Sequence, residues 1–201
     1  SLSLVKRKLE EALKRRFPDE DVKLLAKILR KAVEKDSIFY EEVDVPEEVK
    51  EDLLFFLVNE RLLLPDKIWK TLAWDERIFM LKNGEKYFMP NVVKHLIKKA
   101  EETGEWDPEY AVEEYLREIR EREKEKITTL FRRIKEKLRF RENRLTPEFL
   151  KETIDELGLD LNVEKVIIEF KGGGIISPHL RDSIRSKQLK YEVNPSCLDK
   201  S

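Results

Sequence analysis

The side chains that most often carry enzyme chemistry are few in this sequence, and their spacing predicts no active site. The two histidines, His95 and His179, lie far apart, and neither belongs to a set of ligands at the spacing of a metal site. We expect His95 on a helix surface and His179 in a turn or at a strand edge. Gly172-Gly173-Gly174 lacks the Lys and the Ser or Thr of a phosphate-binding loop, and the single cysteine, Cys197, has no paired His motif. We therefore expect no enzyme activity, no metal and no cofactor.

Basic side chains are the strongest remaining chemical signal, and they gather in two segments. Residues 126–144 carry eight basic side chains against two acidic ones, and residues 171–190 carry five against one. Lys and Arg supply the phosphate contacts that dominate nucleic-acid binding, so both segments are candidate contact surfaces. The alternative is a solvated, Lys- and Arg-rich surface, which explains the first segment equally well. The basic residues are Lys126, Arg132, Arg133, Lys135, Lys137, Arg139, Arg141, Arg144, Lys171, Arg181, Arg185, Lys187 and Lys190.

The overall charge limits how the chain could attract nucleic acid. Its 201 residues include 41 basic and 42 acidic side chains, a net charge of −1, so any nucleic-acid surface must be a local patch. Abundant Lys, Glu and Arg beside a single Gln resemble the composition of proteins from hot-growing organisms. One cysteine, no apolar run near about 20 residues and no signal-peptide pattern predict a cytoplasmic protein without a membrane span.

The second basic segment lies among elements that the sequence defines well. Thr146-Pro147 predicts the start of a helix, because Thr is a good N-cap and Pro fits the first helical position. An apolar stripe continues that helix to a stop at Gly158, and a second amphipathic helix follows, opened by Asp160 or Asn162 and extending to about Lys171. Residues 175–178 and 191–195 are bounded by turn formers, which predicts two strands joined by a basic wing.

This succession of two short helices, a glycine, a strand, a wing and a returning strand resembles prokaryotic, archaeal or bacterial, winged-helix DNA-binding domains over residues 127–197. The motifs that carry the resemblance are Gly174-Ile175-Ile176-Ser177-Pro178 and Tyr191-Glu192-Val193-Asn194-Pro195. The resemblance implies that the second helix enters the DNA major groove and that the wing touches the DNA backbone. With the basic clusters it implies DNA contacts from Arg132, Arg133, Asn162, Lys165, Lys171, Arg181, Arg185 and Lys187.

The second helix also contains the residues that fit DNA least well. Its outward positions include Glu164 and Glu169, whose charges repel phosphate, and Ile168, which fits a protein contact at least as well. Asn162 and Lys165 are the side chains that would read base edges. We therefore carry two hypotheses: a DNA-binding protein that regulates transcription, and a non-catalytic module that binds protein.

The N-terminal half predicts a related but less regular module over residues 1–104. Apolar residues at helical spacing indicate helices from Val5 to Leu13 and from Val22 to Val33, which also offer a homodimer interface. Farther on, Asn83-Gly84 between apolar runs predicts a hairpin that pairs residues 78–81 with residues 87–89.

The segment between the two modules, residues 105–126, has few apolar positions and favourably spaced charges, which predicts a solvated connecting helix. The sequence thus predicts a mainly helical α+β protein made of two winged-helix-like modules, residues 1–104 and 127–201, joined by a charged helix. Its expected partners are double-stranded DNA, a protein partner or a second copy of the chain, and no membrane.

Overall fold

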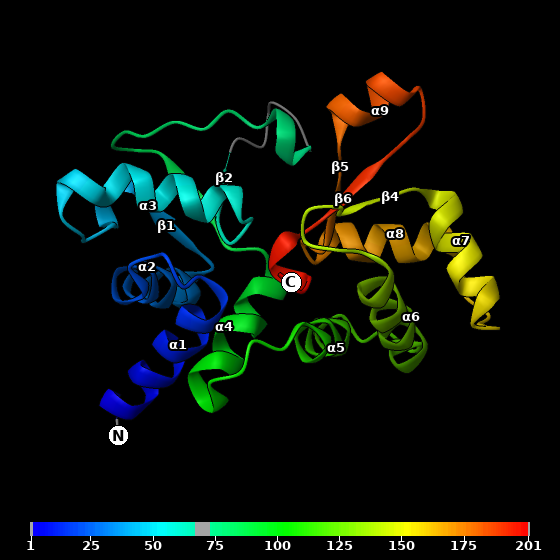
Figure 1. The fold of residues 1–201 in the computed structure, drawn as a ribbon, viewed down its shortest axis with the longest axis horizontal. Coiled ribbons are helices and arrows are strands. Elements are labelled where there is room, and N and C mark those ends of the chain that lie inside the picture. Colours follow the sequence, from blue (N-terminus) through cyan, green and yellow to red (C-terminus); the bar gives the residue numbers. More distant parts are fainter. Residues whose placement is uncertain (1, 67–72, 201) are drawn as a thin grey trace. The chain divides into compact units, whose positions relative to one another are not determined.

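A computed structural model of the chain describes residues 2–66 and 73–200. It is an α+β protein and mainly helical, as the sequence predicts, with two small three-stranded antiparallel sheets in the described ranges. The chain forms two compact units (Figure 1). Of the described residues, 2–66 and 79–107 form the N-terminal unit, and 73–78 and 108–200 form the C-terminal unit. None of the described helices is both long and apolar enough to cross a membrane.

The N-terminal unit packs helices against one small sheet. Its elements are α1 (Leu2–Arg16), α2 (Val22–Lys35), β1 (Ser37–Phe39), η1 (Tyr40–Glu42), α3 (Glu47–Asn59), β2 (Leu64–Pro65), β3 (Lys86–Phe88) and α4 (Asn91–Thr103). The strand order is β1-β3-β2, and both pairs are antiparallel, with Ile38 opposite Tyr87 and Leu64 opposite Phe88. The third strand of this unit therefore lies between the first two.

The apolar faces of the first two helices form the core of this unit. Leu9 and Leu13 of α1 and Leu25 and Leu29 of α2 are fully buried. The helix α1 packs against both α2 and α4, which explains the apolar spacing along its sequence. The sequence predicted a possible homodimer interface on these two helices. Because the apolar faces are buried inside the unit, such an interface would have to use the remaining residues of α1 and α2.

The predicted hairpin around Asn83-Gly84 is right in its turn and wrong in its strands. Gly84 adopts φ +90°, and the Glu85 N–H donates to the Lys82 carbonyl oxygen over 3.1 Å, which closes a turn. Residues 78–81, however, form no strand. Because β1 and β2 already occupy the two edges of β3, no edge of β3 remains for residues 78–81 to pair with.

The C-terminal unit has its own sheet, with strand order β4-β6-β5. Its elements are η2 (Trp74–Glu76), α5 (Pro108–Glu118), α6 (Lys124–Lys137), β4 (Arg144–Leu145), α7 (Pro147–Glu156), α8 (Val163–Gly172), β5 (Ile176–Pro178), α9 (Leu180–Ser186), β6 (Tyr191–Val193) and η3 (Pro195–Cys197). Thr146 caps α7 by accepting the Phe149 N–H over 3.0 Å. The strands β5 and β6 pair with Ile176 opposite Val193. The two helices and two strands predicted here are therefore confirmed.

The solvated helix predicted over residues 105–126 is wrong in two respects. The helices α5 and α6 are separate, because Arg120 between them has φ +56°, a left-handed conformation in which a helix commonly ends. The helix α5 is also a core element, since Ala111, Tyr115 and Leu116 are among its buried residues. These few apolar positions share one face, so a stripe exists although charged residues dominate the segment.

The two sheets share one strand arrangement and differ in the elements that connect their strands. In each, the third strand lies between the first two, and a helix precedes the second strand: α3 precedes β2, and α8 precedes β5. The connection from β2 to β3 contains η2, which belongs to the C-terminal unit. The connection from β5 to β6, residues 179–190, contains α9, and we call these residues the wing.

Candidate nucleic-acid interface

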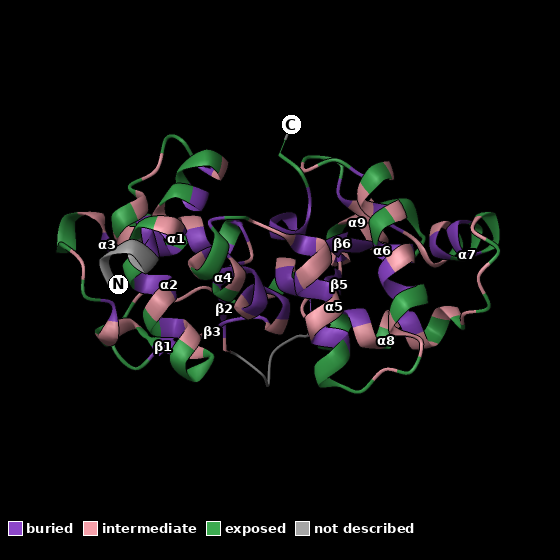
Figure 2. Ribbon diagram, turned by 90° about the horizontal axis from the view of Figure 1, so that it is seen from below, coloured by how far each residue is buried: buried purple, intermediate pink, exposed green. Residues whose placement is uncertain are grey.

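The wing carries three of the eight predicted DNA-contacting residues on one short helix. Arg181 and Arg185 lie in α9, and Lys187 is its C-cap, with φ +57°. All three side chains are exposed, and no residue of α9 is buried (Figure 2). The sequence predicted a wing between two strands but not the helix within it, so the placement of these cations on α9 and at its C-cap is a finding of the structure.

The acidic residue of the wing does not neutralise these three cations. Asp182 is the single acid in the wing, and its Oδ2 accepts a hydrogen bond from Arg144 Nε on β4 over 2.6 Å. This hydrogen bond lowers the pKa of Asp182, so the carboxylate stays ionised beside Arg144. Arg185 lies 4.0 Å from the other carboxylate oxygen, and its side chain is 81% exposed. Within the described residues, the remaining two cations form no ion pair. The wing therefore presents positive charge to solvent.

The other predicted cations lie elsewhere in the C-terminal unit. Lys171 is exposed at the C-terminal end of α8, and β5 separates it from α9 (Figure 1). On α6, Arg132 Nε donates to Glu109 of α5 over 3.0 Å, and Arg133 Nη2 donates to Glu156 of α7 over 2.7 Å. The two arginines of α6 thus join helices within the unit, and the structure does not gather them with the wing cations.

The two side chains predicted to read base edges have structural partners. Asn162 Oδ1 caps α8 by accepting the Lys165 N–H over 2.9 Å. Lys165 forms ion pairs with Glu121 and with Glu123, the second over 3.2 Å. The hydrogen bond to Glu121 is the largest of the contacts that raise the pKa of Lys165. A base contact by Lys165, or a bidentate base contact by Asn162, would break a contact that holds α8 in place.

The C-terminal end of α8 rests on the buried helix α5. Tyr115 OH donates to the Glu169 carbonyl oxygen over 2.6 Å, and burial raises the pKa of Tyr115 to about 12. Gly173 lies so close to the Tyr115 ring that a Cβ there would be 2.5 Å from the ring carbon Cε2. Burial, followed by repulsion from Glu121, raises the pKa of the Glu169 carboxyl to about 7. These contacts fix which face of α8 points outward.

An apolar groove of about 570 Å³ lies along α8, and α7 and the end of the wing form its other walls. Among its lining side chains, Ile168 is 69% exposed and Leu189 is 47% exposed. Exposed apolar patches rimmed by polar residues are typical of surfaces that bind protein. The apolar residues that line the groove are Pro147, Val163, Ile167, Ile168, Leu189 and Tyr191.

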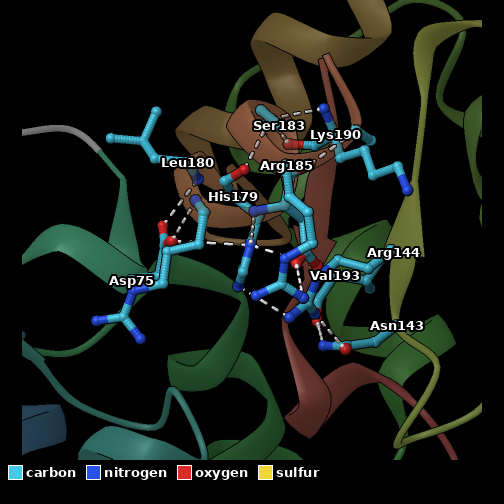
Figure 3. Close-up of polar contacts among 12 residues, drawn as sticks. Asp75, Asn143, Arg144, His179, Leu180, Ser183, Arg185, Lys190 and Val193 are labelled. Atoms are coloured by element: carbon cyan, nitrogen blue, oxygen red, sulfur yellow. Dashed lines mark hydrogen bonds and ion pairs between the residues drawn. The ribbon is translucent and has the colours of Figure 1, made fainter. Parts of the chain in front are cut away.

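A carboxylate from far away in the sequence holds the N-terminal end of the wing helix (Figure 3). Asp75 Oδ1 accepts the Leu180 N–H over 3.1 Å, and Asp75 Oδ2 accepts the Arg181 N–H over 3.0 Å. Asp75 lies in η2, where the Trp74 N–H donates to Ser177 Oγ on β5 over 3.2 Å. Sequence reasoning missed Asp75, because no local pattern connects residues that are 105 positions apart.

His179 and Ser183 close the wing on itself (Figure 3). The His179 N–H donates to the Lys190 carbonyl oxygen over 2.8 Å, and Ser183 Oγ accepts the Lys190 N–H over 2.9 Å. His179 Nε2 lies 2.8 Å from Arg144 Nη2, and it accepts there because a guanidinium can only donate. His179 follows β5 directly, where a strand-edge residue was predicted, and its side chain is buried.

The remaining side chains with catalytic potential lie apart from the wing. His95 is buried in α4, and the predicted surface position is wrong because His95 shares the inner face of α4 with Val92 and Leu96. Cys197 is buried in η3. Across residues 2–66 and 73–200, no group of three or more His, Cys, Asp or Glu side chains is placed to hold a metal ion.

Comparison with known proteins and protein families places the chain in a family. No curated protein and no solved structure matches the chain. A family model matches residues 7–200, which include nearly all of both units. The chain therefore belongs to the family that this model describes.

Proposed function

We propose that the C-terminal unit binds double-stranded DNA through the wing, and that the protein is a transcription regulator of the winged-helix type. The observation that carries the proposal is the exposed set of Arg181, Arg185 and Lys187 on α9, beside an acid that Arg144 already holds. Arginine and lysine side chains bind phosphate oxygens, and such contacts supply most of the affinity for nucleic acid.

The strand order of the C-terminal unit supports the same proposal. The resemblance to winged-helix domains implies a helix before the second strand and a wing between the second and third strands, and α8 and α9 stand at those places. The side chains of α8 suit DNA less well, because Glu164 is exposed and both Asn162 and Lys165 hold the fold. We therefore expect contacts to the DNA backbone to dominate and sequence preference to be weak.

Binding to a labelled duplex of mixed sequence at low salt tests this proposal by fluorescence anisotropy. The unmodified protein should bind, and replacing Arg181, Arg185 and Lys187 together by Ala should weaken binding by at least about tenfold. The matched control replaces three exposed cations of α2, Lys23, Lys27 and Lys31, by Ala and so removes the same charge from the N-terminal unit.

The control triple variant should bind within about twofold of the unmodified protein, because local phosphate contacts set the affinity. An unmodified protein that does not bind at low salt contradicts the proposal. Equal losses in the two triple variants also contradict it, because net charge alone would then explain the binding.

A second candidate function is protein binding through the groove, and we infer a second copy of this chain as the occupant. Glu164 and Lys171 flank Ile168 on the exposed face of α8, four residues before it and three after it. In an antiparallel, two-fold packing of two α8 helices, Glu164 of one copy faces Lys171 of the other. The apolar centre and the opposite charges at its two ends make this face self-complementary.

Sedimentation of charge-swap variants tests the second candidate. Ile168→Asp should give a monomer, and Ile184→Asp, an equally exposed position on α9, should leave the dimer intact. Glu164→Lys should dissociate the dimer by placing like charges together, and adding Lys171→Glu should restore it. A strict monomer for the unmodified protein at high concentration contradicts this candidate.

A further inference from the structure

We propose that Asp75 is a positioning residue for the wing: it holds α9 folded and thereby sets where the wing cations can meet phosphate. The structural part of this inference rests on the geometry of α9 alone. Its functional part rests on the proposed DNA binding, so the two parts need separate measurements.

The wing helix needs anchors because it cannot be stable by itself. It has seven residues, and isolated helices shorter than about 12 residues are marginal in water even for sequences with high helix propensity. No residue of α9 is buried, so an apolar core does not fix it. The polar contacts at its ends must therefore determine whether it forms.

Asp75 supplies the partners that the first turn of α9 lacks. The first four N–H groups of a helix have no partner within the helix. In α9 these are the N–H groups of residues 179–182: the His179 N–H donates to the Lys190 carbonyl oxygen over 2.8 Å, and the Asp182 N–H lies 3.2 Å from His179 Nδ1. The other two, from Leu180 and Arg181, both donate to the Asp75 carboxylate.

The placement of Asp75 makes these contacts hard to replace. Its side chain is only 7% exposed, so the carboxylate itself is largely shielded from water. A carboxylate at a helix N-terminus also interacts favourably with the helix dipole. The hydrogen bond from the Trp74 N–H to Ser177 Oγ fixes η2 on β5, directly before the wing. We call residues 73–78 the clamp.

The clamp comes from a different part of the chain than the wing that it holds. Residues 73–78 belong to the C-terminal unit, and the sequence places them between β2 and β3 of the N-terminal unit. The wing therefore owes its conformation to a segment outside its own strand connection.

Amide hydrogen exchange of the full chain tests the structural part. Asp75→Ala should speed the exchange of the Leu180 and Arg181 amides by about tenfold, because the carboxylate is their acceptor. Trypsin should then cleave faster within the wing.

Glu76→Ala is the matched control, since it removes an exposed acid from the same short helix. It should change neither the amide exchange nor the rate of trypsin cleavage. Unchanged exchange in Asp75→Ala overturns the inference. Asp75→Asn, which keeps the shape of the side chain, provides the same test if the Ala variant fails to fold.

Duplex binding by the same two variants tests the functional part. Removing a negative charge near the wing would by itself strengthen binding to phosphate, and Glu76→Ala measures that effect. If Asp75 positions the wing, Asp75→Ala should have the opposite effect and lower the affinity for duplex DNA by about fivefold or more. The positioning role is overturned if Asp75→Ala speeds amide exchange in the wing and yet binds duplex with the same affinity as Glu76→Ala. If the unmodified protein does not bind duplex, the proposed function fails, while the exchange result still decides whether Asp75 holds α9.

Discussion

The two units place different side chains around the same strand order. In the N-terminal unit, the helix before the second strand, α3, exposes four acids, Glu47, Glu48, Glu51 and Asp52. In the C-terminal unit, the helix at that place, α8, exposes a mixed surface with Ile168 at its centre. The strand connections differ more, since cations gather on the wing, whereas the connection from β2 to β3 supplies the clamp.

This difference shows that the fold alone does not assign a function to either unit. A surface as acidic as that of α3 repels phosphate, although the sheet beside it has the same strand arrangement as the sheet of the C-terminal unit. The proposed function therefore rests on the side chains of one wing and on the contacts that hold it. Variants that alter one unit and spare the other can test this account.

The largest expected effect is at the close contact between Tyr115 of α5 and Gly173, the C-cap of α8. Gly173→Ala would place a Cβ 2.5 Å from the Tyr115 ring, so either α8 or the ring must move. We expect a loss of about 3 kcal/mol in the free energy of unfolding, measured with urea. Gly158→Ala is the control: no atom lies within 4 Å of its Cβ, and its φ of +65° costs only about 1 kcal/mol. Equal losses would contradict the close packing of α5 and α8.

A smaller effect is expected from removing one helix N-cap in each unit, which also tests whether Asn162 reads bases. Asn162→Ala removes the N-cap of α8, and Asp21→Ala removes the N-cap of α2, which accepts the Leu24 N–H over 3.3 Å. Each should lower the free energy of unfolding by about 1 kcal/mol. Neither should change the preference among duplex sequences. If Asn162→Ala relaxes that preference, then α8 does read bases, and the account given for α8 is wrong.

The smallest expected effect depends on pH. In the folded chain the pKa of Glu169 is raised to about 7 from the ordinary 4.5, chiefly by burial, so its protonated form favours folding. The free energy of unfolding should therefore decline as pH rises from 4.5 to about 7 and stay lower above that. Glu169→Gln should remove this decline, which is about 1 kcal/mol after allowance for solvent screening. The exposed Glu164→Gln is the control. A pH profile that Glu169→Gln leaves unaltered would contradict the shifted pKa.

Local signals in the sequence predicted the parts of the fold that depend on near neighbours. Thr146-Pro147 predicted the start of α7, and Gly84 predicted a turn, because capping and positive φ depend on adjacent residues. For the start of α8 the sequence offered Asp160 or Asn162, and Asn162 is the N-cap. The break at Arg120 was missed, since the left-handed position there is occupied by a residue that seldom adopts it.

Contacts between distant segments could not be predicted in the same way. Counting charges within residues 126–144 suggested an open basic surface, yet Arg132 and Arg133 also pair with Glu109 of α5 and Glu156 of α7, which lie outside that range. Asp75 gives no sequence signal at all, because its role depends on how the clamp meets the wing. The three wing cations were predicted as a group because they lie on one short segment.

The salt dependence of duplex binding tests the central claim most directly. Each phosphate contact contributes about 0.9 to the slope of log affinity against log salt concentration. If Arg181, Arg185 and Lys187 each hold a phosphate, replacing all three by Ala should reduce the slope by about 2 to 3, and the α2 control triple should keep the slope of the unmodified protein. Equal slopes for the unmodified protein and the wing triple variant would contradict the claim that the wing binds DNA.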